Sequence, residues 1–178
     1  MIPQPAIKKW QESFPWQKDY QIEQDLIICR AVCALFSDEY LSEHLAFRGG
    51  TTLHKLYLHP QHRWFSGSCK ATTYHLEELL GTKLRALYQR RKGRDLFDLW
   101  KALSTQNLNI ENIILCYREY MSFVVDNPPT QKEYWINMEE KIKDEEFLGD
   151  TEMLLRSNEK YNPVEAWNLV RTLLIEKL

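Results

Sequence analysis

Residues 76–87, with the sequence LEELLGTKLRAL, determine the fold class of this chain. The leucines recur at steps of three and four residues, at positions 76, 79, 80, 84 and 87, which is the spacing of one helix face. Glu77 and Glu78 fall where carboxylates oppose the positive end of the helix dipole. We therefore predict a helix that begins near Thr73 and buries its leucine face.

Lys83 lies within this leucine face. Burial of an ammonium group costs several kcal/mol unless an anion or a carboxylate meets it. Lys83 therefore either pairs with such a group, or packs its aliphatic stem on the leucines and extends its charge to water. Lys83 is a candidate catalytic residue.

The chain continues from this helix into a second one. Gly93 interrupts the first helix, and Asp95 is suited to cap the next, whose buried face is formed by Leu96, Leu99 and Leu103. Arg94 and Asp95, followed by Asp98, can equally form a capping pair with a surface salt bridge. Asp95 is expected to pair with Arg94 or Arg90, and Arg94 and Asp95 are nevertheless candidate site residues.

Apolar periodicity predicts further helices over residues 21–45, 110–125 and 134–147. A last helix is expected to begin at Pro163, with Asn162 as its cap. The predicted fold class is therefore mainly α.

A different pattern occupies residues 45–52, with the sequence LAFRGGTT. It predicts a short strand at 45–48, a tight turn at Gly49 and Gly50, and a helix start capped by Thr51 or Thr52. Such a turn can have a purely structural role, in which the glycines only allow the chain to reverse direction. It can also bind phosphate through unpaired amides and two hydroxyls, which makes Gly49–Thr52 a candidate nucleotide-binding segment.

Charge is balanced over the whole chain and uneven along it. The 178 residues carry a net charge of −2, which argues against a protein that binds nucleic acid through bulk charge. Between Lys83 and Lys101, however, seven basic residues face two acidic ones, and between Lys132 and Glu152 three basic residues face eight acidic ones. The basic segment could bind an anionic ligand, and the two segments could contact each other. Alternatively, both are solvated helix faces.

The four cysteines, at positions 29, 33, 69 and 116, lack the spacing of a zinc site, and no secretory signal accompanies them. We expect reduced thiols and a cytoplasmic protein, without membrane insertion because the apolar stretch at 26–36 is short. His59 and His62 could hold a metal only outside a regular helix, because Pro60 separates them. No metal site is predicted.

Two segments together carry a family resemblance. Residues 44–57 read HLAFRGGTTLHKLY, and residues 78–99 read ELLGTKLRALYQRRKGRDLFDL. They resemble two signatures of the AbiEii/AbiGii nucleotidyltransferase toxin family, a group of bacterial type IV toxin–antitoxin and abortive infection proteins. The resemblance covers most of residues 1–105 in two blocks and is faint afterwards.

The resemblance implies a polymerase-β-like nucleotidyltransferase core joined to a helical C-terminal part, with magnesium and a nucleoside triphosphate (NTP) as reactants. By this likeness Gly49, Gly50 and Thr51 contact the triphosphate, Lys83 reaches its phosphates, and Arg94 with Asp95 belong to a later catalytic motif. The acceptor would be RNA, such as tRNA, or protein. A cognate antitoxin would be encoded nearby.

One departure from the family pattern affects the activity. The family places an Arg-x-Ser-x-Asp-x-Asp strand after the Gly-Gly turn, whereas this chain has no Asp or Glu between Glu43 and Glu77. Arg63 and Trp64 therefore resemble the junction of an internal deletion. Glu77 and Glu78 cannot replace the missing pair, since adjacent helical side chains diverge by roughly 100°.

We therefore expect a truncated nucleotidyltransferase remnant at 1–63, a helical domain at 64–178, and an inactive enzyme. Missing strands would leave edges that favour a homo-oligomer. The alternatives are a non-catalytic helical protein that binds a nucleotide, an RNA or a partner, and a gene product without present function.

Overall fold

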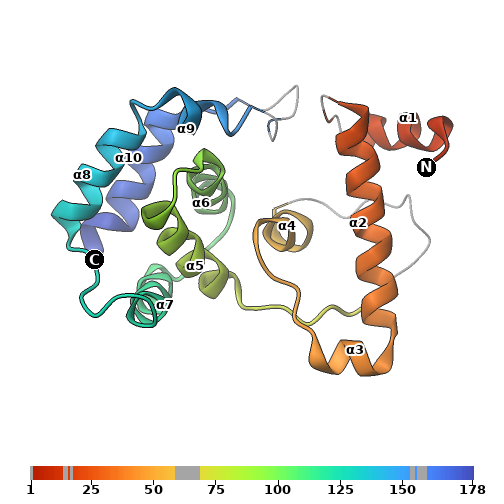
Figure 1. Cartoon of the computed structure of the whole chain (residues 1–178), viewed down its shortest axis with the longest axis horizontal. Coiled ribbons are helices and arrows are strands. Elements are labelled where there is room, and N and C mark those ends of the chain that lie inside the picture. Colours follow the sequence, from red (N-terminus) through yellow and green to blue (C-terminus); the bar gives the residue numbers. More distant parts are fainter. Residues whose placement is uncertain (1, 14–15, 17, 59–68, 153–154, 156–159) are drawn as a thin grey trace.

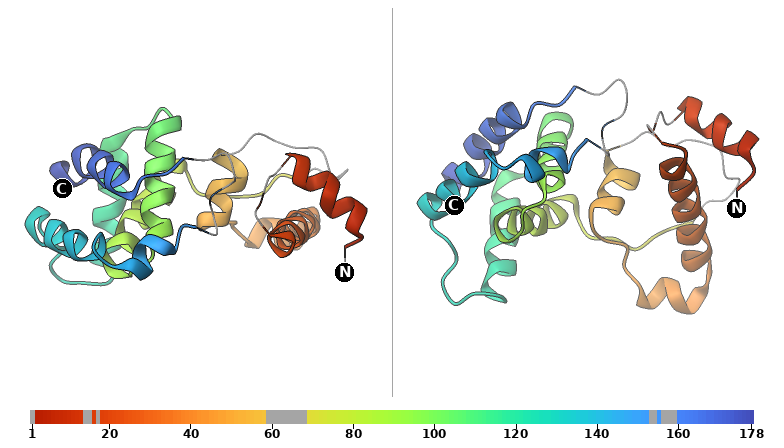
Figure 2. Two further views of the ribbon diagram at one scale, coloured as in Figure 1. Left: turned by 90° about the horizontal axis from the view of Figure 1, so that it is seen from above. Right: turned by 45° about the horizontal axis from the view of Figure 1, so that its top comes forward.

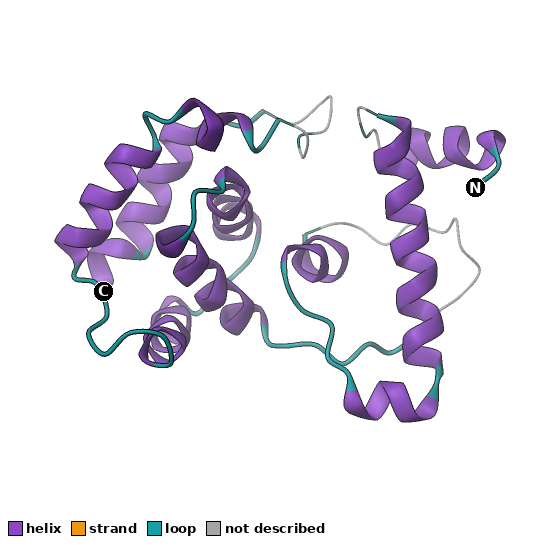
Figure 3. Ribbon diagram, in the orientation of Figure 1, coloured by secondary structure: helices purple, strands orange, loops and turns teal. Residues whose placement is uncertain are grey.

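A computed structural model describes residues 2–13, 16, 18–58, 69–152, 155 and 160–178. Helices account for almost all regular structure in these residues (Figure 3), so the prediction of a mainly α fold is confirmed. The elements are α1 (Gln4–Ser13), α2 (Asp19–Ser37), α3 (Glu39–His44), α4 (Gly50–Thr52), the π-helical η1 (Leu53–Tyr57), α5 (Leu76–Gln89), α6 (Gly93–Thr105), α7 (Ile110–Ser122), α8 (Gln131–Lys141), α9 (Glu145–Gly149), α10 (Pro163–Leu173) and the 3₁₀ turn η2 (Ile175–Lys177).

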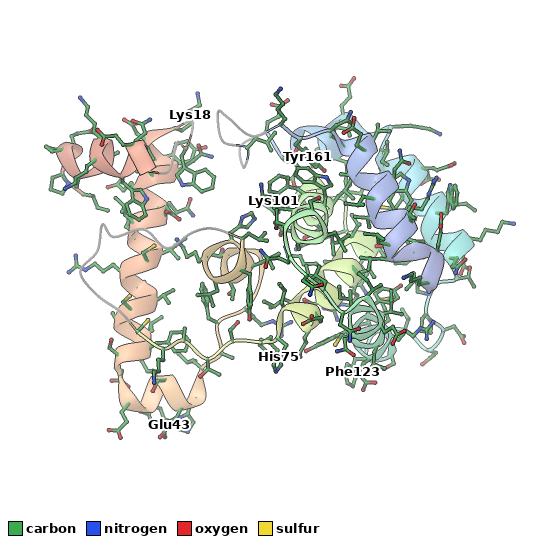
Figure 4. All side chains as sticks on the ribbon, turned by 180° about the vertical axis from the view of Figure 1, so that it is seen from behind. Lys18, Glu43, His75, Lys101, Phe123 and Tyr161 are labelled. Carbon is green, nitrogen blue, oxygen red and sulfur yellow. The ribbon has the colours of Figure 1, made fainter. Side chains whose placement is uncertain are left out.

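The helices form a bundle and an arm. Helices α5–α10 make the bundle, α1–α3 make the arm, and α4 lies between α2 and the α5–α6 pair (Figures 1 and 2). Within the bundle α5 packs against α6 and α7, and α6 packs against α10. The side chains in Figure 4 show the same division, with Lys18 and Glu43 on the arm and Lys101 and Tyr161 on the bundle.

Two apolar clusters follow this division. The larger one is built on the leucine face of α5, where Leu80, Leu84 and Leu87 are fully buried, and it extends to Leu53 of η1. The smaller one joins α1 to α2 and contains Ile7, Trp10, Ile22 and Leu26. The proposed division at residue 63 falls outside the described residues and stays a prediction.

Several predicted helices have different ends in the structure. The helix expected over 21–45 is interrupted at Asp38, whose carboxylate accepts the Leu41 N–H at 2.9 Å and caps α3. The helix expected over 134–147 is likewise two helices, α8 and α9. The cap at Asn162 is confirmed, because its side chain accepts the N–H groups of Val164 and Glu165.

The strand predicted at residues 45–48 is wrong. Phe47 forms only an isolated parallel bridge with Thr73, because no further segment among the described residues extends the pairing. The predicted threonine cap is also wrong: Gly49 occupies the N-cap position with φ of 95°, and no side chain caps α4. The need for glycine at this turn is confirmed by that positive φ, which L side chains adopt only with strain.

The basic and acidic segments meet each other. Arg91 reaches Asp144 at 3.1 Å, and Lys92 reaches Glu146 at 3.5 Å. Because these pairs are largely exposed, each contributes little to stability. They join the residues just before α6 to α9 and its N-cap, so much of the basic charge is matched within the chain.

The four cysteines are free thiols and are only partly buried. The Cys69 sulfur lies 3.8 Å from that of Cys33, which brings residue 69 beside α2. In the described part of the chain, no helix is both long enough and apolar enough to cross a bilayer.

Candidate functional site

A cavity of about 520 Å³ lies where the arm meets the bundle. Its walls come from α2, the start of α4, η1, α5 and α6, and its lining residues are Trp16, Gln21, Gln24, Asp25, Ile28, Gly50, Thr51, His54, Lys55, Lys83, Arg90, Arg94 and Asp98. Four of these side chains, those of Lys55, Lys83, Arg90 and Arg94, are cationic, and two are carboxylates. The charge that this cavity offers to a ligand therefore depends on how these cations are paired within the chain.

Lys83 projects from α5 into this cavity with a side chain only 9% exposed. Its ammonium lies 2.6 Å from an Asp98 oxygen and 3.0 Å from an Asp95 oxygen. Burial acts to lower the pKa of Lys83, but the two carboxylates outweigh it, so this pKa is raised. Lys83 is therefore charged, and its charge is compensated from within the chain.

The resemblance implies that Lys83 and the Gly-Gly turn contact the same triphosphate, and the structure places the two side by side. A Cβ atom placed on Gly50 would be 3.0 Å from the Lys83 nitrogen and 3.1 Å from an Asp98 oxygen. A side chain at residue 50 would require the ends of Lys83 and Asp98 to shift by a few tenths of an ångström, so glycine favours this close approach. The close approach joins residues that are more than 30 positions apart in the sequence.

Asp98 connects Lys83 to a histidine. His54 Nε2 lies 2.6 Å from the second Asp98 oxygen, and the imidazole ring stacks near Phe97 with centroids 6.0 Å apart. Burial acts to raise the pKa of Asp98, but the hydrogen bond from His54 and the charge of Lys83 outweigh it, so this pKa is lowered. Asp98 therefore remains ionised inside the protein.

Asp95 lies behind Lys83 and has no exposed surface. Arg90 donates to both of its oxygens, at 2.6 and 2.7 Å. The predicted pairing of Asp95 with Arg90 or Arg94 is thus confirmed for Arg90. The predicted helix cap is wrong, because α6 begins after Lys92 without a side-chain cap and the Asp95 carboxylate is engaged by Lys83 and Arg90.

The lowered pKa of Asp98 gives a pH prediction. A carboxyl group whose folded pKa lies below the unfolded value stabilises the fold above the unfolded value, and this contribution is lost as the pH falls through the folded pKa. The advantage of the wild type over Asp98→Asn in urea denaturation should be largest near pH 7 and shrink below pH 3.8, the ordinary pKa of the group. A constant difference from pH 7 to pH 3 would contradict this assignment.

The structure brings some of the predicted site residues together. Gly50, Thr51, Lys83 and Arg94 line one cavity, whereas Gly49, Thr52 and Asp95 do not. Thr52 is fully buried, and its hydroxyl has no hydrogen-bond partner among the described residues. The roles proposed for all seven residues stay predictions.

Sequence reasoning missed other lining residues. Asp98 was recognisable because it follows Asp95 by three positions, on the same helix face. Trp16, Gln24 and Asp25 belong to an opening segment that is also similar to the family, but only the tertiary structure brings them to the site. His54 and Lys55 belong to the π-helical turn, whose wider winding cannot be read from the apolar pattern.

The carboxylates in this region do not fit a magnesium site. Asp25 accepts from Lys55 at 2.6 Å, and Asp98 and Asp95 are engaged by cations as described above. Magnesium prefers carboxylates that are free to bind it, with octahedral geometry. In the part of the chain that the structure describes, no cluster of three His, Cys, Asp or Glu residues could hold a metal.

The other candidates for metal binding lie elsewhere. Glu78 accepts from the Tyr120 hydroxyl at 2.6 Å, and Glu77 accepts from the Asn109 N–H at 3.3 Å, so both carboxylates join α5 to the region of α7. His59, His62 and the junction at Arg63 and Trp64 lie outside the described residues.

Comparison with known families identifies the class of protein. The family model described as nucleotidyl transferase AbiEii toxin, type IV TA system, matches residues 58–168, and the chain belongs to this family. The match includes residues 78–99 and extends beyond residue 105, where the resemblance in sequence becomes faint, while residues 44–57 lie outside it. No curated protein and no solved structure matches the chain.

Proposed function

We propose that this chain binds a nucleoside triphosphate in the cavity between α2 and the α5–α6 pair, and that it does not transfer the nucleotide unaided. The family description implies nucleotidyl transfer, for which an NTP is the donor. The observation that carries the proposal is a contrast among the cations of the cavity. Arg94 has a long ion pair, whereas Lys55, Lys83 and Arg90 are each closely paired with a carboxylate.

Arg94 is the best-placed group for a phosphate. Its side chain is 47% exposed, and its ion pair within the described residues, to Asp150, is long at 3.8 Å. Lys55, Lys83 and Arg90 each have a carboxylate within 3.0 Å. A guanidinium with free donors can bind phosphate in a bidentate manner.

The remaining predicted residues support the phosphate site in different ways. The amides of Gly50 and Thr51 lie at the start of a helical turn on the cavity wall, where the backbone favours an anion. Lys83 lies directly beside Gly50, and Asp95 orients Lys83 and Arg90. Gly49 provides the turn, and Thr52 packs beneath it.

Loss of transfer follows from the chemistry of the reaction. Nucleotidyl transfer needs cations that bridge the phosphates and neutralise the developing charge, and these cations need carboxylates to hold them. The two cavity carboxylates, Asp25 and Asp98, already pair with Lys55, Lys83 and His54, and Asp95 behind them pairs with Lys83 and Arg90. Binding and catalysis should therefore separate in this chain.

The binding half is tested with Arg94→Ala. Calorimetric titration with NTP in the presence of EDTA should show binding by the wild type, weakened about 10- to 100-fold by the substitution, because a charged hydrogen bond contributes roughly 1.5–3 kcal/mol. Arg118→Ala is the matched control, because Arg118 is exposed on α7 and does not line the cavity. Equal affinities for the wild type and Arg94→Ala would place the phosphates elsewhere.

The catalytic half is tested with labelled NTP. Purified wild-type protein, magnesium, each labelled nucleoside triphosphate and total tRNA should yield no labelled RNA and no labelled protein. Incorporation above that of a protein-free sample, abolished in Arg94→Ala, would show that the chain is an active nucleotidyltransferase.

The partners are proposed on the family alone. A type IV toxin–antitoxin system implies a cognate antitoxin. An RNA acceptor, a cytoplasmic location and association with a second copy remain predictions. The alternative of a non-catalytic helical protein that binds RNA or a partner is favoured if the cavity binds no nucleotide.

A further inference from the structure

The cavity has two walls of different chemistry. The wall from η1, α5 and α6 carries Lys55, Lys83, Arg90 and Arg94. The wall from α2 carries Gln21, Gln24, Asp25 and Ile28, and Trp16 lies just before this helix. One side therefore suits phosphate, and the other offers amide groups beside apolar surface.

The α2 wall is one face of a regular helix. Positions 21, 24, 25 and 28 follow each other at steps of three, one and three residues, which places all four side chains on the same side of α2. Ile22 and Leu26 point instead into the small apolar cluster with α1. This cluster fixes the rotation of α2 and thereby directs the polar face into the cavity.

The polar groups on this face differ in how they are engaged. The Asp25 carboxylate accepts from Lys55 at 2.6 Å and from the Trp10 indole at 3.0 Å. The Gln21 amide oxygen accepts the Lys18 N–H at 3.0 Å. The Gln24 side chain forms no hydrogen bond with any described residue, so its amide can serve a ligand.

An amide beside aromatic and aliphatic surface is suited to a nucleobase. The side chain of Gln offers a donor and an acceptor in one plane and can pair with a base edge. Aromatic side chains bind the faces of unstacked bases. A cavity of about 520 Å³ also exceeds the need of a triphosphate alone and falls in the range of organic ligands.

We propose that the α2 face recognises the base of a bound nucleotide, and that Gln24 determines base specificity while the opposite wall holds the phosphates. This inference rests on the proposed function, because it assigns a binding surface to the base of the same nucleotide whose phosphates the proposed function places. It makes the arm helix part of the binding site. The ligand class is a nucleoside triphosphate, as distinct from an inorganic polyphosphate.

The test compares nucleotides with a ligand that has no base. ATP, GTP, CTP, UTP and inorganic tripolyphosphate are titrated into the full chain in EDTA. At least one nucleotide should bind the wild type more tightly than tripolyphosphate does. Gln24→Ala should weaken that nucleotide about two- to tenfold, the effect of one neutral hydrogen bond, and leave tripolyphosphate unchanged.

Gln4→Ala is the matched control, since Gln4 is exposed on α1 and does not line the cavity, and it should change neither affinity. Tripolyphosphate binding as tightly as every nucleotide would overturn the base site and leave the phosphate site standing. An equal loss of both ligands in Gln24→Ala would overturn it too. Binding of neither ligand by the wild type would overturn the proposed function and, with it, this inference.

Discussion

Lys83→Met is expected to lower the free energy of unfolding by about 3–5 kcal/mol. The substitution preserves most of the side-chain volume and removes the charge that lies between Asp95 and Asp98. Arg90 still neutralises Asp95, and His54 still contacts Asp98. Asp98, with a side chain only 3% exposed, nevertheless loses its nearest ammonium group inside the protein.

Urea denaturation of the wild type and Lys83→Met measures this loss. Lys132→Met is the control, because Lys132 is exposed on α8 and its replacement should change stability by less than about 0.5 kcal/mol. Adding Asp98→Asn to Lys83→Met should recover part of the loss, since it removes the buried carboxylate that has lost its ammonium partner. A loss below about 1 kcal/mol in the single variant would show that the buried network is not stabilised by Lys83.

This stability effect changes how functional assays must be interpreted. Lys83 is the residue that a motif-based reading would replace first, and its removal is expected to disturb the site and the fold together. Loss of nucleotide binding in such a variant would not distinguish the loss of a ligand contact from the loss of the folded structure. Arg94 and Gln24 are better probes, because both are exposed on the cavity wall and neither is part of the buried ion-pair network.

The sequence predicted the parts of this fold that depend on local pattern. The leucine spacing of α5, the acidic first turn at Glu77 and Glu78, and the cap at Asn162 are all properties of neighbouring residues, and the structure confirms them. The break at Asp38 was equally local. It was missed because the apolar pattern continues across it, although Asp is a common N-cap residue.

The candidate site was only partly predictable. Lys83 stood out because a charged residue in a leucine face needs a partner, and that partner is now identified as the Asp95 and Asp98 pair. The approach of Gly50 to Lys83 and the contribution of α2 depend on tertiary packing between distant segments. Periodicity carries no information about which helices meet, so the second wall of the cavity required the structure.

Gly93 links the stability of the bundle to the position of the site. It is the first residue of α6, and a Cβ atom there would lie 2.0 Å from the Phe147 carbonyl oxygen and 3.5 Å from a Thr151 methyl carbon. The first distance is far inside van der Waals contact, and the neighbour is backbone, which cannot rotate away. The start of α6 and the end of α9 are therefore in contact because residue 93 has no side chain.

Gly93→Ala is accordingly expected to lower the free energy of unfolding by about 3 kcal/mol, at the upper end of overpacking effects. Gly149→Ala provides the control within α9, because a Cβ atom at Gly149 meets nothing within 4 Å. It should be neutral or raise stability by up to about 1 kcal/mol, since alanine favours a helix over glycine. Urea denaturation of both variants measures the difference, and equal stabilities would refute the close approach of α6 and α9.

Gly93→Ala should also alter the cavity. Arg94 follows Gly93 directly, and its backbone N–H donates to Asp150 at 3.2 Å, so separating α6 from α9 shifts the guanidinium on the cavity wall. Gly93→Ala should therefore weaken NTP binding under conditions in which the variant remains folded, while Gly149→Ala should not. Full affinity in folded Gly93→Ala would show that the phosphate site does not depend on how α6 packs against α9.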